Sequence, residues 1–328
     1  MYESARAHMK PRDIRSRAFS LMRKCWKTLL IAAMLMCLFG WISTAVEARG
    51  KHLAQQAYDA CKEAYIADHP MPEGEEDSEE WTFYIEWMAS HMAEQAYDDA
   101  YRPWKWAVGG LDLIGLLFSC VIAVRLSRGL LNALRGEECT PQCLRSGWAR
   151  TSTVCWLAVQ RELRIGLWAL LPLIFHFALD LFFGVHAGTI STLLILLVAI
   201  WARMHYALAE MHLADDPYST MTASDALRLA VDDADAFTIR AMCGVLWPVV
   251  IPYGVMIAVG CLAIFGIAPV LLASIVDALC SLLIALFLTP CYVCIYDEIR
   301  QRIRAAEEAV PPTEGLARAR ALTEEHPI

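Results

Sequence analysis

Charged residues are scarce in this chain, and long stretches contain almost none. Asp, Glu, Lys and Arg make up 20% of the 328 residues, against about 25% in an average soluble domain. Apolar residues make up 57%, and the mean hydropathy is +0.40. Charge that is clustered between long apolar runs is typical of a protein that crosses a membrane several times.

Short catalytic motifs are also missing. The chain has no HExxH zinc-protease motif, no GxSxG nucleophile elbow, no phosphate-binding loop and no dinucleotide fingerprint. The net charge of −8 comes largely from one acidic segment, and no basic patch suggests contact with nucleic acid. We therefore expect a protein without enzymatic activity, without a cofactor and without a bound metal.

Basic residues are absent from the two short turns that join neighbouring apolar runs, residues 184–188 and 266–268, but they are dense at the N-terminus, in 125–164 and after residue 300. Cytoplasmic segments carry the excess of Lys and Arg. This pattern predicts an all-α polytopic protein of the cell (inner, cytoplasmic) membrane with six spans and both termini cytoplasmic. The predicted spans are residues 28–46, 106–124, 165–183, 189–208, 239–265 and 269–292.

Residues 1–27 are basic and precede the first apolar run. We expect an amphipathic helix on the lipid surface, with one apolar face formed by Ile14, Phe19, Leu21, Met22 and Trp26. Basic side chains here and at the inner end of the fourth span are predicted to contact lipid headgroups; they are Arg15, Arg17, Arg23, Lys24, Lys27 and Arg203. The alternative is that these charges only set the topology.

The first apolar run also has a rival interpretation. It follows positive charge and ends in Val46-Glu-Ala48, which resembles a signal-peptidase site. The long, patterned region before it favours a retained span.

Residues 47–105 form the long polar segment, with 14 acidic and five basic residues. Two helical stretches, about 48–67 and 78–102, flank a Pro- and Gly-containing break. We expect an acidic, extracytoplasmic helical hairpin that offers a surface to a protein partner. An octapeptide starting at His52 recurs at His91. A metal site that uses both histidines is one reading; chance similarity between Ala-rich helices is the favoured one.

The remaining polar segments are predicted to be cytoplasmic. They are the basic segment 125–164, an amphipathic helix within 209–238 that Thr222 or Ser224 caps, and a tail, 297–328, that is disordered after residue 310.

Twelve cysteines are present, but only Cys61 lies in the polar segment 47–105, so that segment cannot form an internal disulfide. Cys139 and Cys143, together with Cys291 and Cys294, offer four sulfur ligands for zinc. Their spacing is poor for a zinc site, which favours unligated thiols.

Four ionisable residues lie inside the predicted spans: Asp112, His176, Asp180 and Asp277. Such residues are costly in lipid and often mark function. Helical rise places all four in the outer half of the membrane, which suggests one polar pocket for a proton, a cation or a small polar ligand. The alternative is that they form hydrogen bonds between helices or stay wet at the interface.

Several soft motifs are shared with a known family. They are Arg17-Ala18 with Trp26, Leu167-Trp-Ala-Leu-Leu-Pro172, Tyr206, Ala214-Asp-Asp-Pro217 followed by Ser224 and Ala226, and Pro290-Cys-Tyr292 followed by Tyr296. In these the chain resembles a domain-of-unknown-function family of bacterial multipass membrane proteins. The resemblance implies an inner-membrane location and six spans, and no reaction. The chain departs from the family pattern at Leu173, at Asp232–Asp235 and in the acidic hairpin.

Two functions fit these observations. The first is a non-enzymatic scaffold or envelope-associated protein that binds partners or lipids. The second is a small-solute or ion transporter that uses the four intramembrane residues.

Overall fold

The computed structural model describes residues 11–70, 79–145, 150–183, 188–215, 220–236, 247, 250–259, 262 and 270–308. Within these ranges every regular element is a helix and none is a strand. The predicted all-α class is therefore confirmed.

Three helices in the described ranges are long and apolar enough to cross a membrane. They are α2 (Pro11–Asp68), α3 (Glu79–Leu134) and α9 (Val270–Glu308). Their most apolar windows are only 22%, 22% and 39% buried within the protein, so most of this apolar surface needs lipid to cover it. A shorter apolar helix covers Val250–Val259. The chain is thus an all-helical membrane protein.

Helix α2 contains both the basic N-terminal stretch and the first apolar run, and a kink separates the two. The only non-helical backbone angles inside it are at Cys25, where the helix kinks. The buried face of this first part carries Ile14, Ala18, Leu21 and Cys25. Of the predicted apolar face, Ile14 and Leu21 are buried within the protein, whereas Phe19 and Trp26 are exposed, as side chains that face lipid would also be. Contact of this helix with the lipid surface stays a prediction.

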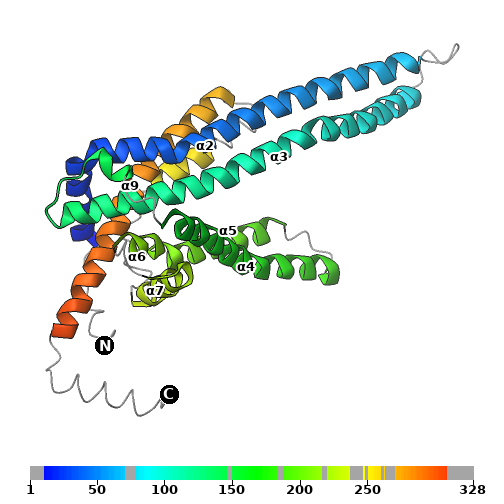
Figure 1. Ribbon diagram of the computed structural model, residues 1–328. Coiled ribbons are helices and arrows are strands. Elements are labelled where there is room, and N and C mark those ends of the chain that lie inside the picture. The colour runs from blue at the N-terminus through cyan, green and yellow to red at the C-terminus, as the bar shows by residue number, and fades with distance from the viewer. Residues whose placement is uncertain are drawn as a thin grey trace. The chain divides into compact units, whose positions relative to one another are not determined.

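The chain divides into two compact units, of which the smaller covers residues 36–116. In it, α2 and α3 run side by side and antiparallel (Figure 1). A Cβ at Gly50 would lie 2.6 Å from Cβ and Cγ of Trp104, and one at Gly115 would lie 2.7 Å from Cβ of Phe39. Each helix thus contributes one aromatic residue and one glycine, eleven residues apart.

Small residues line the remaining contact between the two arms. Ala54, Ala89 and Ala93 are fully buried, and Ile85 is 6% exposed. Ala54 and Ala93 are the third residues of the two octapeptide copies, and both copies expose their His and Asp. The repeat therefore marks equivalent positions on the two arms, with alanine inward and polar residues outward.

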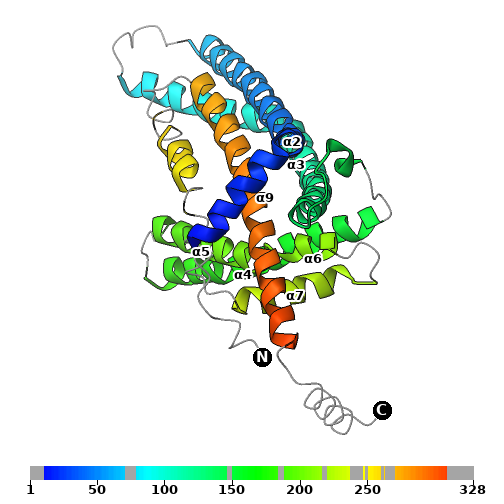
Figure 2. The ribbon, with the colours of Figure 1, turned by 90° about the vertical axis from the view of Figure 1, so that its left-hand side faces the viewer.

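The larger unit contains residues 1–35 and 117–328. Helix α4 (Thr151–Phe183) contacts α5 (Gly188–Tyr206), α6 (Ala209–Asp215) and α7 (Ala223–Ala236), as Figure 2 shows. Helix α6 also contacts α7 and α9. A 3-10 turn, η1 (Pro141–Leu144), follows α3. The core between these elements is made of Leu126, Leu157, Leu208, Met211, Leu227 and Ile295, each at most 1% exposed.

A reciprocal cap begins α7. The Thr222 hydroxyl accepts a hydrogen bond from the Asp225 amide (3.2 Å), and Asp225 accepts one from the Thr222 amide (3.1 Å). Thr222 is therefore the cap, as one of the two predicted candidates, and this arrangement satisfies two amides that the helix start would leave unpaired.

Several predictions concern residues outside the described ranges. These are the two short turns at 184–187 and 266–268, much of the fifth span, and the tail after residue 308.

The close contact at Gly50 leads to a test. We expect Gly50→Ala to destabilise the hairpin by about 1–3 kcal/mol, because the added methyl group must displace Trp104. Gly40→Ala is the matched control on the same helix, since nothing lies within 4 Å of its added Cβ. The measurement is the melting temperature in detergent; equal values for the two variants would contradict the close approach.

Candidate functional site

The structure describes the side chains of two of the four predicted intramembrane residues. Asp112 on α3 and Asp277 on α9 are both exposed. They belong to different compact units, and the side chains of His176 and Asp180 lie outside the described residues. Within the described ranges, no group of three or more His, Cys, Asp or Glu side chains is arranged to hold a metal ion. A common pocket of the four residues stays a prediction.

Two of the predicted lipid-contacting cations have protein partners. Arg17 lies 2.5 Å from Asp297 and 3.0 Å from Glu298, both on α9. Lys24 donates to the carbonyl oxygens of Ala133 (2.9 Å) and Glu137 (3.4 Å) after α3. These side chains fasten the N-terminal part of α2 to neighbouring helices.

The other four predicted cations differ in their surroundings. Arg15 lies 5.9 Å from the centre of the Trp247 ring, and Lys27 5.7 Å from that of Trp26. Arg203 is 67% exposed and 3.4 Å from Glu162. Arg23 is exposed. Contact of these residues with lipid headgroups remains a prediction.

The densest polar arrangement centres on α6, a helix of seven residues. Ala209, Met211, Leu213 and Ala214 are at most 4% exposed. The ionisable residues Glu210, His212 and Asp215 alternate with these apolar ones, and each meets a partner on another helix. We call Glu210, His212 and Asp215 with their partners the α6 hub.

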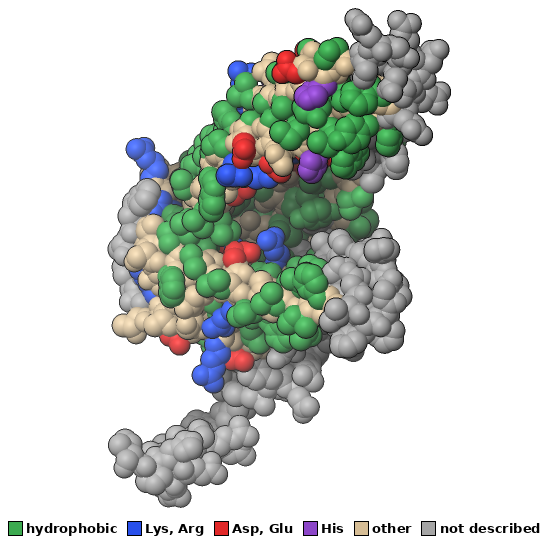
Figure 3. Space-filling view, turned by 90° about the vertical axis from the view of Figure 1, so that its right-hand side faces the viewer, with side chains coloured by type: hydrophobic (Ala, Val, Ile, Leu, Met, Phe, Trp, Pro, Cys, Tyr) green, Lys and Arg blue, Asp and Glu red, His purple; other side chains and the backbone are tan. Residues whose placement is uncertain are grey.

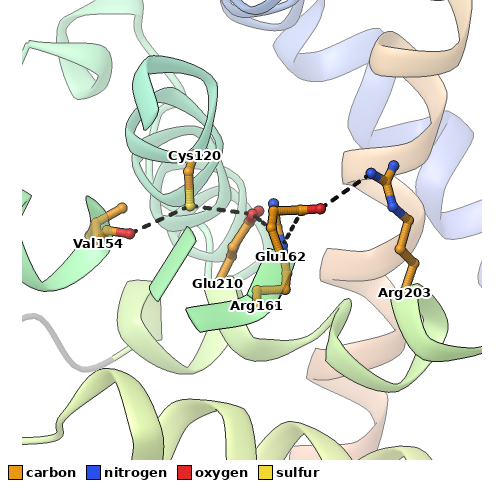
Figure 4. Close-up of polar contacts among 6 residues, drawn as sticks. All are labelled: Cys120, Val154, Arg161, Glu162, Arg203 and Glu210. Atoms are coloured by element: carbon orange, nitrogen blue, oxygen red, sulfur yellow. Dashed lines mark hydrogen bonds and ion pairs between the residues drawn. The ribbon is translucent and has the colours of Figure 1, made fainter. Parts of the chain in front are cut away.

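Glu210 faces α4 and α3 (Figure 4). Its Oε1 lies 2.5 Å from Nη1 of Arg161 and 3.6 Å from Sγ of Cys120. The Cys120 thiol also lies 3.7 Å from the carbonyl oxygen of Val154. Burial alone would lower the pKa of Arg161, but the Glu210 carboxylate outweighs it and raises the pKa above its usual value. The pair connects α6 to α4.

His212 faces α7 and α9, and its side chain is completely buried. Its Nδ1 lies 2.8 Å from Nη2 of Arg300, and its Nε2 lies 3.0 Å from Oδ2 of Asp233, although the two are not aligned as a full hydrogen bond. A guanidinium group can only donate, so Nδ1 accepts and the ring proton sits on Nε2, facing Asp233. Both ring nitrogens face protein groups, so the ring is not presented to a substrate.

Asp215 completes the hub at the end of α6. It accepts a hydrogen bond from the Tyr296 hydroxyl (3.1 Å) and is paired with Arg135 at the end of α3. Arg300 donates from Nε to the same hydroxyl (3.0 Å). The Tyr296 ring also meets the His212 ring edge to face, at 5.1 Å. One continuous network thus links α3, α6, α7 and α9.

The sequence analysis named only part of this network. Asp215 and Tyr296 belong to the motifs that carry the family resemblance, and the structure brings them into contact. Glu210, His212, Arg161 and Arg300 were missed. Asp233 was also missed, although one signal could have identified it: it falls on the apolar stripe of α7 with Leu227, Ala230 and Ala234, and an acid on such a stripe needs a buried partner.

Comparisons with protein-family models, with curated proteins and with solved structures find no significant match to this chain. The resemblance described above therefore remains an expectation, and the function must be argued from the chain's own residues.

The Arg161–Glu210 pair leads to a second test. Glu210→Gln removes the charge that compensates a buried guanidinium, and we expect a loss of about 2 kcal/mol, or roughly 4–8 °C in melting temperature. Asp98→Asn is the control, because Asp98 is 67% exposed and its ion-pair partner Lys105, 3.4 Å away, is 57% exposed. We expect that control to lose less than about 1 kcal/mol. A loss at Asp98 as large as that at Glu210 would contradict the role of the hub.

Proposed function

We propose that this chain is a non-enzymatic, six-span membrane protein that holds its helical hairpin out from the membrane to bind a basic protein partner. The observation that carries the proposal is a set of exposed aromatic side chains on the hairpin, at the start of α3. Phe83 is 73% exposed, Tyr84 51% and Trp87 56%.

These aromatic residues take no part in holding the hairpin together. The two arms meet through alanines, while Phe83 and Trp87, four residues apart, share an outer face of α3. Figure 3 shows hydrophobic side chains gathered over this part of the hairpin. Exposed, clustered aromatic residues are characteristic of protein-binding surfaces.

The negative charge of the hairpin indicates which kind of partner it would bind. Residues 47–105 carry 14 acidic and five basic residues. An anionic lipid surface would repel this segment, whereas a partner rich in Arg and Lys would be attracted. Arg in particular can stack on the exposed aromatic rings and pair with the neighbouring carboxylates.

Six spans are supported by exposed apolar side chains on the helices beyond α2, α3 and α9. On α4, Leu167, Leu171, Ile174 and Phe177 are 64–69% exposed, and on the helix Val250–Val259, Val250 and Ile257 are 66% and 65% exposed. Leu197 on α5 is 61% exposed. Lipid would cover these side chains if α4, α5 and the fifth predicted span also cross the membrane.

The proposed topology can be tested by labelling native cysteines. Cys61 on the hairpin should react with a membrane-impermeant maleimide in intact cells, whereas Cys155 on α4 should react only after permeabilisation. Trypsin separates the two residues, because Cys61 lies in peptide 52–62 and Cys155 in peptide 151–161, so mass spectrometry reads both in one sample. Labelling of Cys155 in intact cells would overturn this topology.

Partner binding can be tested by photocrosslinking from single positions. A photoreactive amino acid in place of Tyr84 or Trp87 should give a crosslink to a basic protein in cells. The same amino acid in place of Leu113 on α3, which is 54% exposed within the predicted second span, is the matched control and should give no such product. Glu86→Lys should reduce the product at position 84 by about tenfold, through charge repulsion at the interface.

Two outcomes would contradict the proposal. If positions 84 and 87 formed crosslinks only to lipid, the proposal that the hairpin binds a protein partner would be wrong. Solute uptake into proteoliposomes that is abolished by Asp277→Asn, with unchanged melting temperature, would favour the transporter instead.

A further inference from the structure

Three cysteines from separate segments meet outside the predicted spans. Cys25 lies at the kink of α2, Cys139 follows α3, and Cys143 lies in η1. The sulfurs of Cys139 and Cys143 both lie against Gly129 of α3, and Cys25 is close enough to Cys139 to act on its pKa. A Cβ on Gly129 would lie 2.7 Å from Sγ of Cys143 and 3.9 Å from Sγ of Cys139, so the glycine is what lets the sulfurs lie against α3.

The backbone around these thiols is held in place by side chains of α2. Thr28 donates a hydrogen bond to the carbonyl oxygen of Cys139 (3.3 Å). Lys24 donates to Ala133 and Glu137, on the approach to Cys139. Cys25 is 2% exposed, while Cys139 and Cys143 are half-buried. Cys139 and Cys143 are therefore the more exposed members of the group, and Cys25 is the enclosed one.

The surroundings of Cys139 favour its thiolate. Hydrogen bonds from the thiols of Cys143 and then of Cys25 hold the pKa of Cys139 well below its usual value, against the opposing effect of burial, and the charge of Lys24 acts in the same direction. The thiolate is the form of cysteine that attacks disulfides. Cys155, on α4, is also half-buried and serves as an internal reference.

A zinc site is less well supported by this arrangement. The sequence offered Cys291 and Cys294 as further ligands, but these thiols lie on α9, and the third thiol at Cys139 comes from Cys25 instead. Within the part of the chain that the structure describes, no group of three or more His, Cys, Asp or Glu side chains, these cysteines included, is arranged to hold a metal ion.

We propose that Cys139 and Cys143 form a thiol–disulfide exchange site that reacts with low-molecular-mass disulfides. The Cys139 thiolate attacks one sulfur of a disulfide RSSR, which forms Cys139–S–SR and releases RS⁻. The Cys143 thiol then loses its proton to RS⁻ or solvent and attacks Cys139 Sγ, which forms the Cys139–Cys143 disulfide and releases a second RS⁻. Two protein thiols are oxidised and one RSSR is reduced to two RSH. This inference does not rest on the hairpin partner.

The test uses the full-length protein in detergent with oxidised glutathione as the disulfide. Trypsin cleavage after Arg135 and Arg145 leaves both cysteines in one peptide, 136–145. We expect this peptide to lose two hydrogen atoms in mass. At pH 6, alkylation of Cys139 by iodoacetamide should be about tenfold faster than that of Cys155, because a larger thiolate fraction outweighs its lower intrinsic nucleophilicity.

Variants separate the two steps. In Cys143→Ser, the glutathione adduct should accumulate on Cys139, and in Cys25→Ser the rate advantage over Cys155 should fall severalfold. Three results would overturn the proposal: equal alkylation rates at Cys139 and Cys155, a crosslink between peptide 136–145 and the peptide that contains Cys25, or one equivalent of zinc in the purified protein that is released when these thiols are alkylated.

Discussion

Buried ionisable side chains on α6 are the constraint on which the larger unit depends. Glu210, His212 and Asp215 lie within a helix whose apolar residues are almost fully enclosed. A polar or charged side chain that is removed from water is costly unless a partner compensates it. Arg161, Asp233, Arg300 and Arg135 supply that compensation from α4, α7, α9 and the segment after α3. These parts of the chain are therefore held together, because displacing one of them leaves a buried polar group without its partner.

For the same reason, polar contacts rather than apolar packing determine how the helices of this unit are placed. Large apolar side chains on α4 and α9, such as Leu171 and Leu283, point away from the protein. Lipid is as apolar as these side chains, so burying them against another helix gains little. The position of one helix against another then depends on ion pairs, such as that of Arg17 with Asp297 and Glu298. Small residues allow the close approach elsewhere.

Sequence reasoning recovered the features that depend on local patterns. Apolar runs gave the helical class, and the Pro- and Gly-containing break before Glu79 separated the two hairpin arms. It did not recover the α6 hub, because Glu210 and Arg161 are 49 positions apart and their pairing depends on the tertiary structure. It also did not relate Cys139 to Cys25, since nothing local links these two residues. Asp233 was not recovered either, although its position as an acid on the apolar stripe of α7 can be seen in the sequence.

The reciprocal glycine–aromatic contacts of the hairpin have a consequence for its register. A contact made only of alanines would tolerate a shift of one helix along the other. The two contacts lie eleven residues apart on both helices, close to three full turns, and each arm carries one aromatic and one glycine. A slip by one turn would bring Trp104 and Phe39 off their glycines at the same time. Only one alignment of the two arms therefore places both aromatic side chains against their glycines.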